Sequence, residues 1–202
     1  MESNSRKTQI LKEIFGYDSF RKGQEEIVDQ ILNGRDVLAI MPTGAGKSLC
    51  YQVPALLMSG ITIVVSPLIS LMIDQVKALN EAGVHAAYIN SALTERQITK
   101  ALELAAAGRY KMIYVAPERL LTPRFLDFAC HTELSMVTID EAHCISQWGQ
   151  DFRPSYVKIT EFIRQLPRRP VVSAFTATAT QKVREDILEV LDLHITWAEI
   201  LS

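Results

Sequence analysis

The feature that most constrains this chain is a short segment, residues 41–48, which reads Met-Pro-Thr-Gly-Ala-Gly-Lys-Ser. The apolar residues before it, 37–40, predict a buried strand of a parallel sheet. Gly44 and Gly46 lack a Cβ atom, so the backbone N–H groups of the segment can close around phosphate oxygens. A helix that begins near Lys47 would direct the positive end of its dipole at the same anion. The segment therefore predicts a strand, a phosphate-binding loop and a helix in succession.

The end of this segment carries the chemistry of a nucleoside triphosphate site. Lys47 can reach the β- and γ-phosphates, and the Ser48 hydroxyl can bind Mg²⁺. Met41 stands where the strict G-x-x-x-x-G-K-[ST] pattern has its first glycine, so the match is incomplete. The alternative is a strand-turn-helix connection without a ligand, in which a lysine and a serine directly after the turn have no packing purpose. The residues expected to surround the phosphates are Met41, Pro42, Thr43, Gly44, Ala45, Gly46, Lys47 and Ser48.

A second segment supplies two adjacent carboxylates, Asp140 and Glu141, after the apolar residues 136–139. At the end of a strand, Asp140 would hold Mg²⁺ and Glu141 would orient and polarise the attacking water. The alternative is a pair of solvated carboxylates. Because carboxylates and phosphates repel each other unless a cation lies between them, the ATP interpretation requires the metal. The predicted catalytic residues are Lys47, Asp140 and Glu141.

The Asp-Glu-Ala-His segment and the phosphate loop together resemble a superfamily 2 helicase, and the chain as a whole resembles the RecQ family of DNA helicases. The resemblance covers about residues 10 to 190. Five further segments carry it. They are residues 15–24 (similar to the adenine-binding motif 0), 65–75 (motif Ia), 114–120 (motif Ib), 146–154 (the aromatic-rich loop) and 173–179 (motif III).

The resemblance implies an adenine site. Tyr17 and Arg21 would sandwich the base and Gln24 would hydrogen-bond its edge, since an amide offers a donor and an acceptor that suit N6 and N7. The alternative for Tyr17 and Phe20 is ordinary packing at the start of a helix.

The resemblance also implies that Trp148, Phe152 and Arg153 contact single-stranded DNA. Stacking on aromatic faces tolerates any base sequence and is worth roughly 1–3 kcal/mol per base. The alternatives are a core aromatic for Trp148 and a solvated surface arginine for Arg153, although the glycine and polar residues around Trp148 predict an exposed loop. The residues implied to couple DNA binding to hydrolysis are His143, Thr176 and Thr178. A lone histidine such as His143 is otherwise more often a structural residue.

The chain departs from the RecQ pattern at three positions. Ala45 replaces a glycine of the phosphate loop, and its small methyl group is compatible with binding if the local φ is negative. Gln150 replaces a histidine of the aromatic-rich loop, which puts in doubt any role that needs an imidazolium. Lys22 replaces a proline.

Composition is compatible with a folded domain and excludes little. The chain has 202 residues, of which 48% are hydrophobic, so it can bury a core. Its net charge of −2 gives no support to non-specific nucleic-acid binding, and Arg168 and Arg169 are expected to form a solvated basic step. Three scattered cysteines argue against a disulfide framework or a structural zinc site. No apolar run is long enough to span a bilayer, and the first residues do not resemble a signal peptide, so we expect no membrane association and a cytoplasmic location, in the bacterial cytosol or at the nucleoid.

Apolar runs alternate with amphipathic segments along the chain, which predicts an α/β fold: a RecA-like P-loop domain whose mostly parallel sheet has helices on both faces. The predicted strands are 37–41, 61–66, 85–89, 112–115, 136–140 and 171–175. The predicted helices are 23–32, 47–57, 68–82, 94–106, 155–165 and 180–191. Residues 1–191 are expected to form the ATP-binding lobe, and residues 192–202 a tail or a truncated linker.

The two motifs and the resemblance together imply the first motor lobe of an ATP-dependent DNA helicase, with ATP and Mg²⁺ as cofactors, and the resemblance alone implies that it moves 3′ to 5′. The expected partners are single-stranded or partly duplex DNA and a second RecA-like lobe outside this chain. Two alternatives stay open. One is an ATP-binding regulatory module that does not unwind DNA, and the other is an ATP-independent nucleic-acid adaptor, which would have no use for Lys47, Asp140 and Glu141.

Overall fold

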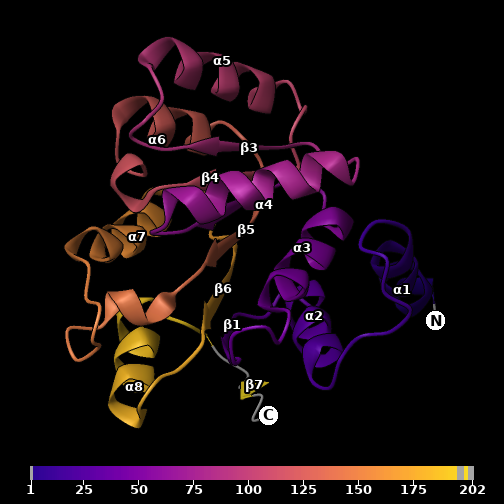
Figure 1. The fold of residues 1–202 in the computed structure, drawn as a ribbon. Coiled ribbons are helices and arrows are strands. Elements are labelled where there is room, and N and C mark those ends of the chain that lie inside the picture. Colours follow the sequence, from indigo (N-terminus) through magenta and orange to yellow (C-terminus); the bar gives the residue numbers. More distant parts are fainter. Residues whose placement is uncertain (1, 195–197, 200–202) are drawn as a thin grey trace.

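The computed structural model describes residues 2–194 and 198–199. Its centre is a seven-stranded sheet with the order β3-β4-β2-β5-β6-β1-β7, and every pairing in it is parallel (Figure 1). The strands are β1 (Val37–Ile40), β2 (Ile61–Val65), β3 (Ala86–Ile89), β4 (Met112–Val115), β5 (Leu134–Ile139), β6 (Val171–Thr176) and β7 (Ala198–Glu199). The α/β class and the mostly parallel sheet predicted from the sequence are confirmed.

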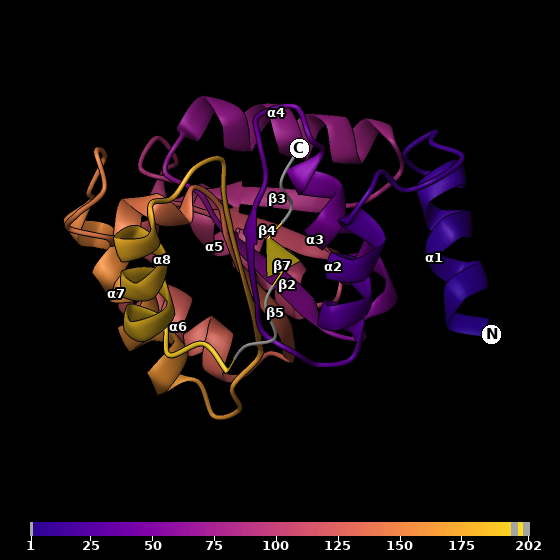
Figure 2. The same ribbon diagram turned by 90° about the horizontal axis from the view of Figure 1, so that it is seen from below.

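Helices cover both faces of the sheet (Figure 2). One face is covered by α2 (Gln24–Leu32), α3 (Lys47–Leu57) and α4 (Ile69–Glu81), whose buried side chains share a core with β1 and β4. The other face is covered by α5 (Glu95–Ala106), α6 (Pro123–Cys130), α7 (Pro154–Gln165) and α8 (Gln181–Val190). Two short 3-10 helices, η1 (Pro117–Arg119) and η2 (Ala142–Ile145), follow β4 and β5. None of the helices in the described ranges is both long and apolar enough to cross a bilayer.

Besides the two 3-10 helices, three elements were not predicted from the sequence. The first, α1 (Glu2–Glu13), is mostly polar and packs outside α2 and α3 through Leu11, and its buried Lys7 ammonium lies 3.0 Å from Glu25. The second, α6, begins with Pro123 at its first position, which suits a helix start. The third, β7, lies within residues 192–202 and pairs with β1 at the sheet edge. Part of the predicted tail therefore extends the sheet.

The register of the sheet brings the ends of three strands together. Ile40 at the end of β1 pairs with Thr176 at the end of β6, and the Met41 N–H donates to the Thr176 carbonyl at 2.9 Å. The Asp140 N–H donates to the Val65 carbonyl at 2.9 Å, which fixes the end of β5 beside β2. The phosphate loop and the acidic pair therefore follow β1 and β5, the two strands on either side of β6, at the same edge of the sheet.

A buried ion pair fixes the start of β1. The Asp36 carboxylate is 3% exposed and accepts two hydrogen bonds from the Arg169 guanidinium, at 3.1 and 2.6 Å. It also accepts from the backbone N–H groups of Val172 (2.8 Å) and His194 (3.0 Å). Arg169 lies in an exposed loop, as expected from the sequence, but its guanidinium is not free, because it binds Asp36 before β1 and the Asp192 carbonyl after α8.

The Asp36 cluster makes a prediction about stability. Asp36→Ala should lower the free energy of unfolding by about 3 kcal/mol, because it leaves the Arg169 charge and the buried Val172 N–H without their acceptor. Urea unfolding measures the loss. Asp74→Ala, at an exposed position on α4, is the matched control and should change little. A loss at Asp36 no greater than at Asp74 would contradict the role assigned to this cluster.

Candidate nucleotide and nucleic-acid site

The loop between β1 and α3 has the backbone geometry of an anion cradle. Gly44 (φ 83°) and Gly46 (φ 80°) lie in the left-handed region that favours glycine. Gly46 caps α3 without a side chain, so the first N–H groups of the helix remain available to an anion. In the described part of the chain the non-glycine residues with positive φ are Glu141 and Asp192, so Ala45 has an ordinary conformation. The negative φ that phosphate binding was expected to require of an alanine at this position is therefore present.

Lys47 and Asp140 face each other across the end of the sheet. The Lys47 ammonium donates to the Met41 carbonyl at 3.3 Å, so it lies folded back over the loop. Burial, followed by the negative charge of Glu141, raises the pKa of Asp140 from 3.8 to about 6, although the Glu141 N–H and the Lys47 charge lower it. A cation at this position would favour the ionised carboxylate. The donors of the loop and the carboxylate of Asp140 thus fit a triphosphate with its metal.

Glu141 adopts a strained backbone conformation, with φ 49° and ψ 47° at the start of η2. A residue of this size rarely occupies the left-handed region, and such conformations cost about 1–3 kcal/mol. The conformation places the Glu141 carboxylate 3.3 Å from Nδ1 of His143.

His143 connects the acidic pair to β6, as proposed from its position in the sequence. Its Nδ1 lies 2.9 Å from the Thr176 hydroxyl, which itself donates to the Thr178 carbonyl at 3.1 Å. Since that hydroxyl donates to Thr178, it can accept a hydrogen bond from His143, an arrangement that requires a proton on Nδ1. The three predicted coupling residues therefore form one hydrogen-bonded chain, and the Glu141 carboxylate lies 3.3 Å from its first member, His143.

The predicted adenine residues lie beside the loop, in a different arrangement from the one expected. Gln24 is buried, and its Nε2 donates to the carbonyls of Ala45 (2.9 Å) and Gly46 (3.3 Å). The Arg21 guanidinium donates to the Gly44 carbonyl at 2.7 Å. Sequence reasoning missed these contacts with the phosphate loop, and adenine binding by Gln24 would need its amide to leave them. Tyr17 is 48% exposed, whereas Phe20 packs in the small core between α1 and α3, as its alternative interpretation held.

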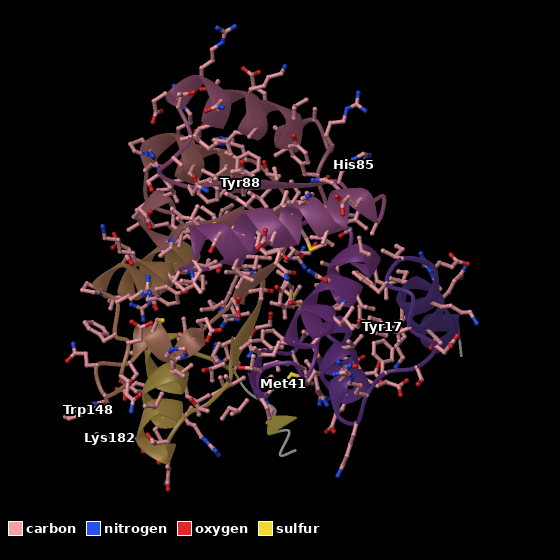
Figure 3. All side chains as sticks on the ribbon, in the orientation of Figure 1. Tyr17, Met41, His85, Tyr88, Trp148 and Lys182 are labelled. Atoms are coloured by element: carbon pink, nitrogen blue, oxygen red, sulfur yellow. The ribbon has the colours of Figure 1, made fainter. Side chains whose placement is uncertain are left out.

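The aromatic-rich loop projects from the end of η2. Trp148 is 64% exposed, which excludes the core interpretation, and the Lys182 ammonium of α8 lies 3.1 Å from its ring centroid (Figure 3). Phe152 is half-buried. The Arg153 guanidinium donates to the Pro67 carbonyl and lies 3.4 Å from the Asp151 carboxylate, so Arg153 is not a freely solvated arginine. These placements leave DNA binding by the loop as a prediction.

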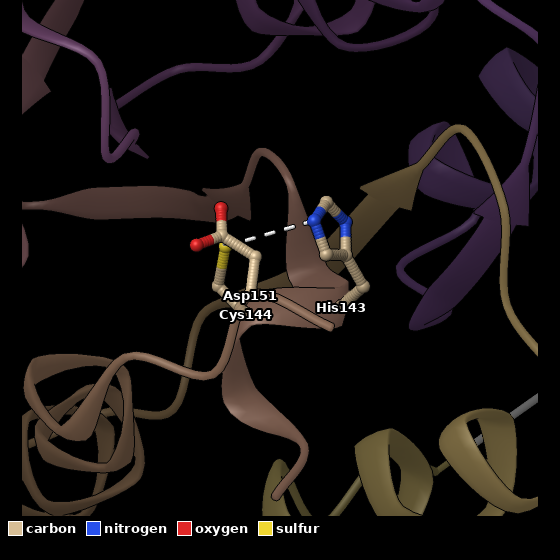
Figure 4. A group of neighbouring side chains, drawn as sticks. All are labelled: His143, Cys144 and Asp151. Atoms are coloured by element: carbon tan, nitrogen blue, oxygen red, sulfur yellow. Dashed lines mark hydrogen bonds between the residues drawn. The ribbon is translucent and has the colours of Figure 1, made fainter. Parts of the chain in front are cut away.

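A junction of His143, Cys144 and Asp151 joins the loop to the segment that carries Asp140 and Glu141 (Figure 4). The Cys144 sulfur lies 3.8 Å from His143 Nε2 and 3.9 Å from an Asp151 oxygen. Burial, and secondly the Asp151 charge, raise the pKa of the Cys144 thiol to about 12, so the thiol is protonated at neutral pH. The Asp151 carboxylate also lies 3.4 Å from the Arg153 guanidinium. The side chains of the junction therefore have hydrogen-bonding or ionic partners within the chain. The sequence analysis gave Cys144 no role, and its position directly after His143 is the signal that could have suggested one.

The raised pKa of Asp140 predicts a pH-dependent stability. A carboxylate with a raised folded-state pKa destabilises the fold above that pKa, and the cost disappears as the pH falls toward the unfolded-state value. Asp140→Asn should therefore raise the free energy of unfolding at pH 8 by about 2–3 kcal/mol, with the gain shrinking below about pH 6. Chemical denaturation at a series of pH values, with Asp74→Asn as the control, measures it. A pH-independent gain would show that Asp140 is not strained by ionisation.

Comparison with known proteins agrees with these features. Residues 21–187 match the model of the DEAD/DEAH box helicase family. The chain is 51% identical to the ATP-dependent DNA helicase RecQ of Bacillus subtilis over 94% of its own length and 32% of that protein. It is 47% identical to the RecQ helicase of Haemophilus influenzae over 91% of its length and 30% of that protein. The chain thus spans about a third of the curated relatives it matches.

Solved structures share the fold at low sequence identity. The DEAD-box helicase Mss116 superposes with a TM-score of 0.76 at 19% identity, over all of this chain and 44% of that one. The DUF1998 helicase MrfA superposes with a TM-score of 0.76 at 17% identity, over 96% of this chain and 29% of that one. The RecA-like architecture and the resemblance to RecQ helicases are both confirmed, and the chain belongs to the DEAD/DEAH box helicase family.

Proposed function

We propose that this chain is the ATP-binding lobe of an ATP-dependent DNA helicase that moves 3′ to 5′ and works with a second RecA-like lobe. The observation that carries the proposal is the register between β1, β5 and β6. It gathers the phosphate loop, the acidic pair and the His143–Thr176 hydrogen bond at one edge of the sheet. Sequence identity to RecQ helicases over most of the chain supports DNA as the nucleic acid.

The residues of the loop would bind the nucleotide through complementary charge. Lys47, released from the Met41 carbonyl, would bind the terminal phosphates, while Ser48 and Asp140 would hold Mg²⁺. When bound, ATP supplies the phosphoanhydride bond and Mg²⁺ neutralises the charge that develops on its phosphates. Tyr17 and Arg21 would sandwich the adenine, with Gln24 at its edge.

Glu141 is the residue proposed to activate water. Its strained backbone directs the carboxylate to the edge of the sheet, and its contact with His143 limits the orientations available to it. A carboxylate held in this way can orient and polarise a water molecule for attack on a phosphate. Because His143 also contacts Thr176, a change at the end of β6 would be transmitted to Glu141.

The aromatic-rich loop is the proposed DNA site. Trp148 offers an exposed ring for stacking without sequence preference, and Phe152 and Arg153 follow it in the same loop. The junction of His143, Cys144 and Asp151 ties this loop to the hydrolytic segment, which is the route by which DNA would stimulate hydrolysis.

A regulatory module that binds ATP without unwinding DNA remains the second candidate. It shares every residue of the nucleotide site, so hydrolysis alone does not distinguish the two. An arginine finger from a partner lobe is worth about 10³–10⁵ in rate, and we therefore propose that this chain alone hydrolyses ATP slowly. Strand separation by the full-length protein decides between the candidates.

The nucleotide site is tested with two substitutions that should separate binding from hydrolysis. Lys47→Ala should weaken binding of a fluorescent ATP analogue with Mg²⁺ by at least about tenfold, because it removes the phosphate-binding cation. Glu141→Gln should leave that affinity within about twofold and abolish DNA-stimulated hydrolysis in the full-length protein. Lys100→Ala on α5 is the control for the loss of one lysine. Unchanged hydrolysis in Glu141→Gln would remove Glu141 from its proposed role.

The loop is tested with Trp148→Ala. Because the ring is exposed, the substitution should leave the melting temperature nearly unchanged while weakening oligo-dT binding about tenfold, within the range expected for the loss of one stacked base. Trp148→Phe keeps an aromatic face and should retain most of the affinity. A large fall in melting temperature with unchanged DNA affinity would mean that Trp148 has a structural role.

A further inference from the structure

We propose that Lys182 is a second part of the nucleic-acid site: it covers one face of Trp148 when no strand is bound, and it binds a strand phosphate when a base replaces it on the ring. This inference rests on the proposed function of the aromatic-rich loop. Its observation is the contact between two distant segments of the chain, with the Lys182 ammonium 3.1 Å from the Trp148 centroid (Figure 3).

The backbone of α8 is anchored in the core, whereas the Lys182 side chain is exposed and rests on the Trp148 ring. The next residue, Val183, is 4% exposed and lies in the same core as Ile145 of η2. Lys182 itself is exposed, and within the described part of the chain no carboxylate lies in ion-pair distance of its ammonium. A lysine on a fixed helix with an aromatic face as its partner can exchange that partner without breaking a salt bridge.

An open cleft lies between the loop and the start of α8. Its volume is about 450 Å³, and Trp148, Gln150 and Asp151 line the side formed by the loop. Thr178 and Thr180 line the opposite side, and His143 also lines the cleft. A ligand in this cleft would therefore touch the exposed ring and two of the three coupling residues at once.

The chemistry of this cleft suits a nucleotide unit of a single strand. The face of an indole attracts a cation and also stacks with a base, so the ammonium and a base compete for one surface. A base arrives with a phosphate on its backbone, and a displaced ammonium can bind that phosphate at short range. The exchange gives the strand one aromatic contact and one charge contact, while Lys182 goes from one partner to another.

The position of α8 connects the exchange to the hydrolytic segment. Thr176 at the end of β6 and Thr178 precede α8 directly, and Thr176 bonds to His143. Movement of Lys182 away from Trp148 would free the loop from the start of α8, leaving the loop attached through the His143, Cys144 and Asp151 junction. The contacts between the loop and the rest of the lobe include this junction, the Arg153 hydrogen bond to the Pro67 carbonyl and the contact of Lys182 with Trp148, of which a strand would replace the last.

The contact without DNA is tested by fluorescence of this chain in a Trp197→Phe background, which leaves Trp148 as its one tryptophan. Lys182→Met should change the emission of Trp148, because the cation leaves the ring face. Lys100→Met, on α5 at the other edge of the sheet, should not change it, and Lys182→Arg should retain most of the parent signal because a guanidinium also stacks on indole. Identical emission in Lys182→Met and the parent would overturn the DNA-free half of the proposal.

The bound state is tested by the salt dependence of oligo-dT binding. One phosphate contact contributes about 0.7 to the slope of log affinity against log salt for a single strand. Lys182→Met should lower the magnitude of the slope by about 0.7, so that over an about fivefold rise in salt the parent loses about threefold more affinity than the variant. Lys182→Arg should restore the slope, and Lys100→Met should leave it unchanged.

The Trp148→Ala variant separates the two levels of the proposal. If Trp148→Ala binds oligo-dT as tightly as the parent, the proposed role of the loop fails. If Trp148→Ala weakens binding while Lys182→Met has the slope of the parent, the loop binds DNA and the role of Lys182 is overturned.

Discussion

The parallel pairing of β1 with β6 is the constraint on which the site depends. Ile40 lies opposite Thr176, and the Met41 N–H closes the pairing one residue later. A shift of register by one residue would turn Thr176 to the other face of the sheet and break its bond with His143. At the other end of β1, Asp36 binds Arg169 and the Val172 N–H, so the first residues of β1 and β6 are also held together. The buried Asp36 carboxylate at the start of these strands thereby helps to align Thr176 with His143 at their carboxyl ends.

The carboxyl end of β5 carries two energetically unfavourable features, which the stability of the rest of the fold must offset. Glu141 has a strained backbone, and ionised Asp140 is buried beside it, so adjacent residues carry a conformational and an electrostatic cost. The electrostatic cost is not relieved by the described neighbours, since the Lys47 charge lowers the pKa of Asp140 less than burial raises it. A cation beside the ionised Asp140 would lower this cost, and a bound polyanion would hold the cation there. We therefore expect binding of a nucleotide with its metal to stabilise this part of the fold.

The sequence predicted those parts of the fold that depend on local pattern. Strands such as β4 were located because every residue is apolar and buried on both faces, and the two loop glycines were located because only glycine adopts their backbone angles easily. The polar helix α1 lacks that pattern and folds through one buried apolar contact and the Lys7 ion pair, so it was missed. The contacts of Arg169 and Gln24 were missed for a different reason. Their partners are distant in sequence, and a polar residue gives no local signal of the partner that it will find.

The aromatic-rich loop combines a buried base with an exposed tip. Its start follows η2, whose residues Ala142 and Ile145 are buried in the main core, so motion at the base of the loop would disturb packing. Its exposed tip carries Trp148, held from outside by a lysine and not by the core. Between them, Cys144 sits between His143 and Asp151 in a site too buried for its thiol to ionise. A strand bound at the tip, as proposed above, would act on the segment of Glu141 through the contacts of this junction, whose strength depends on distance and angle. Coupling of that kind needs a base fixed by packing and a tip that a ligand can reach. The side chains of this loop change from buried to exposed between Ser146 and Gln147.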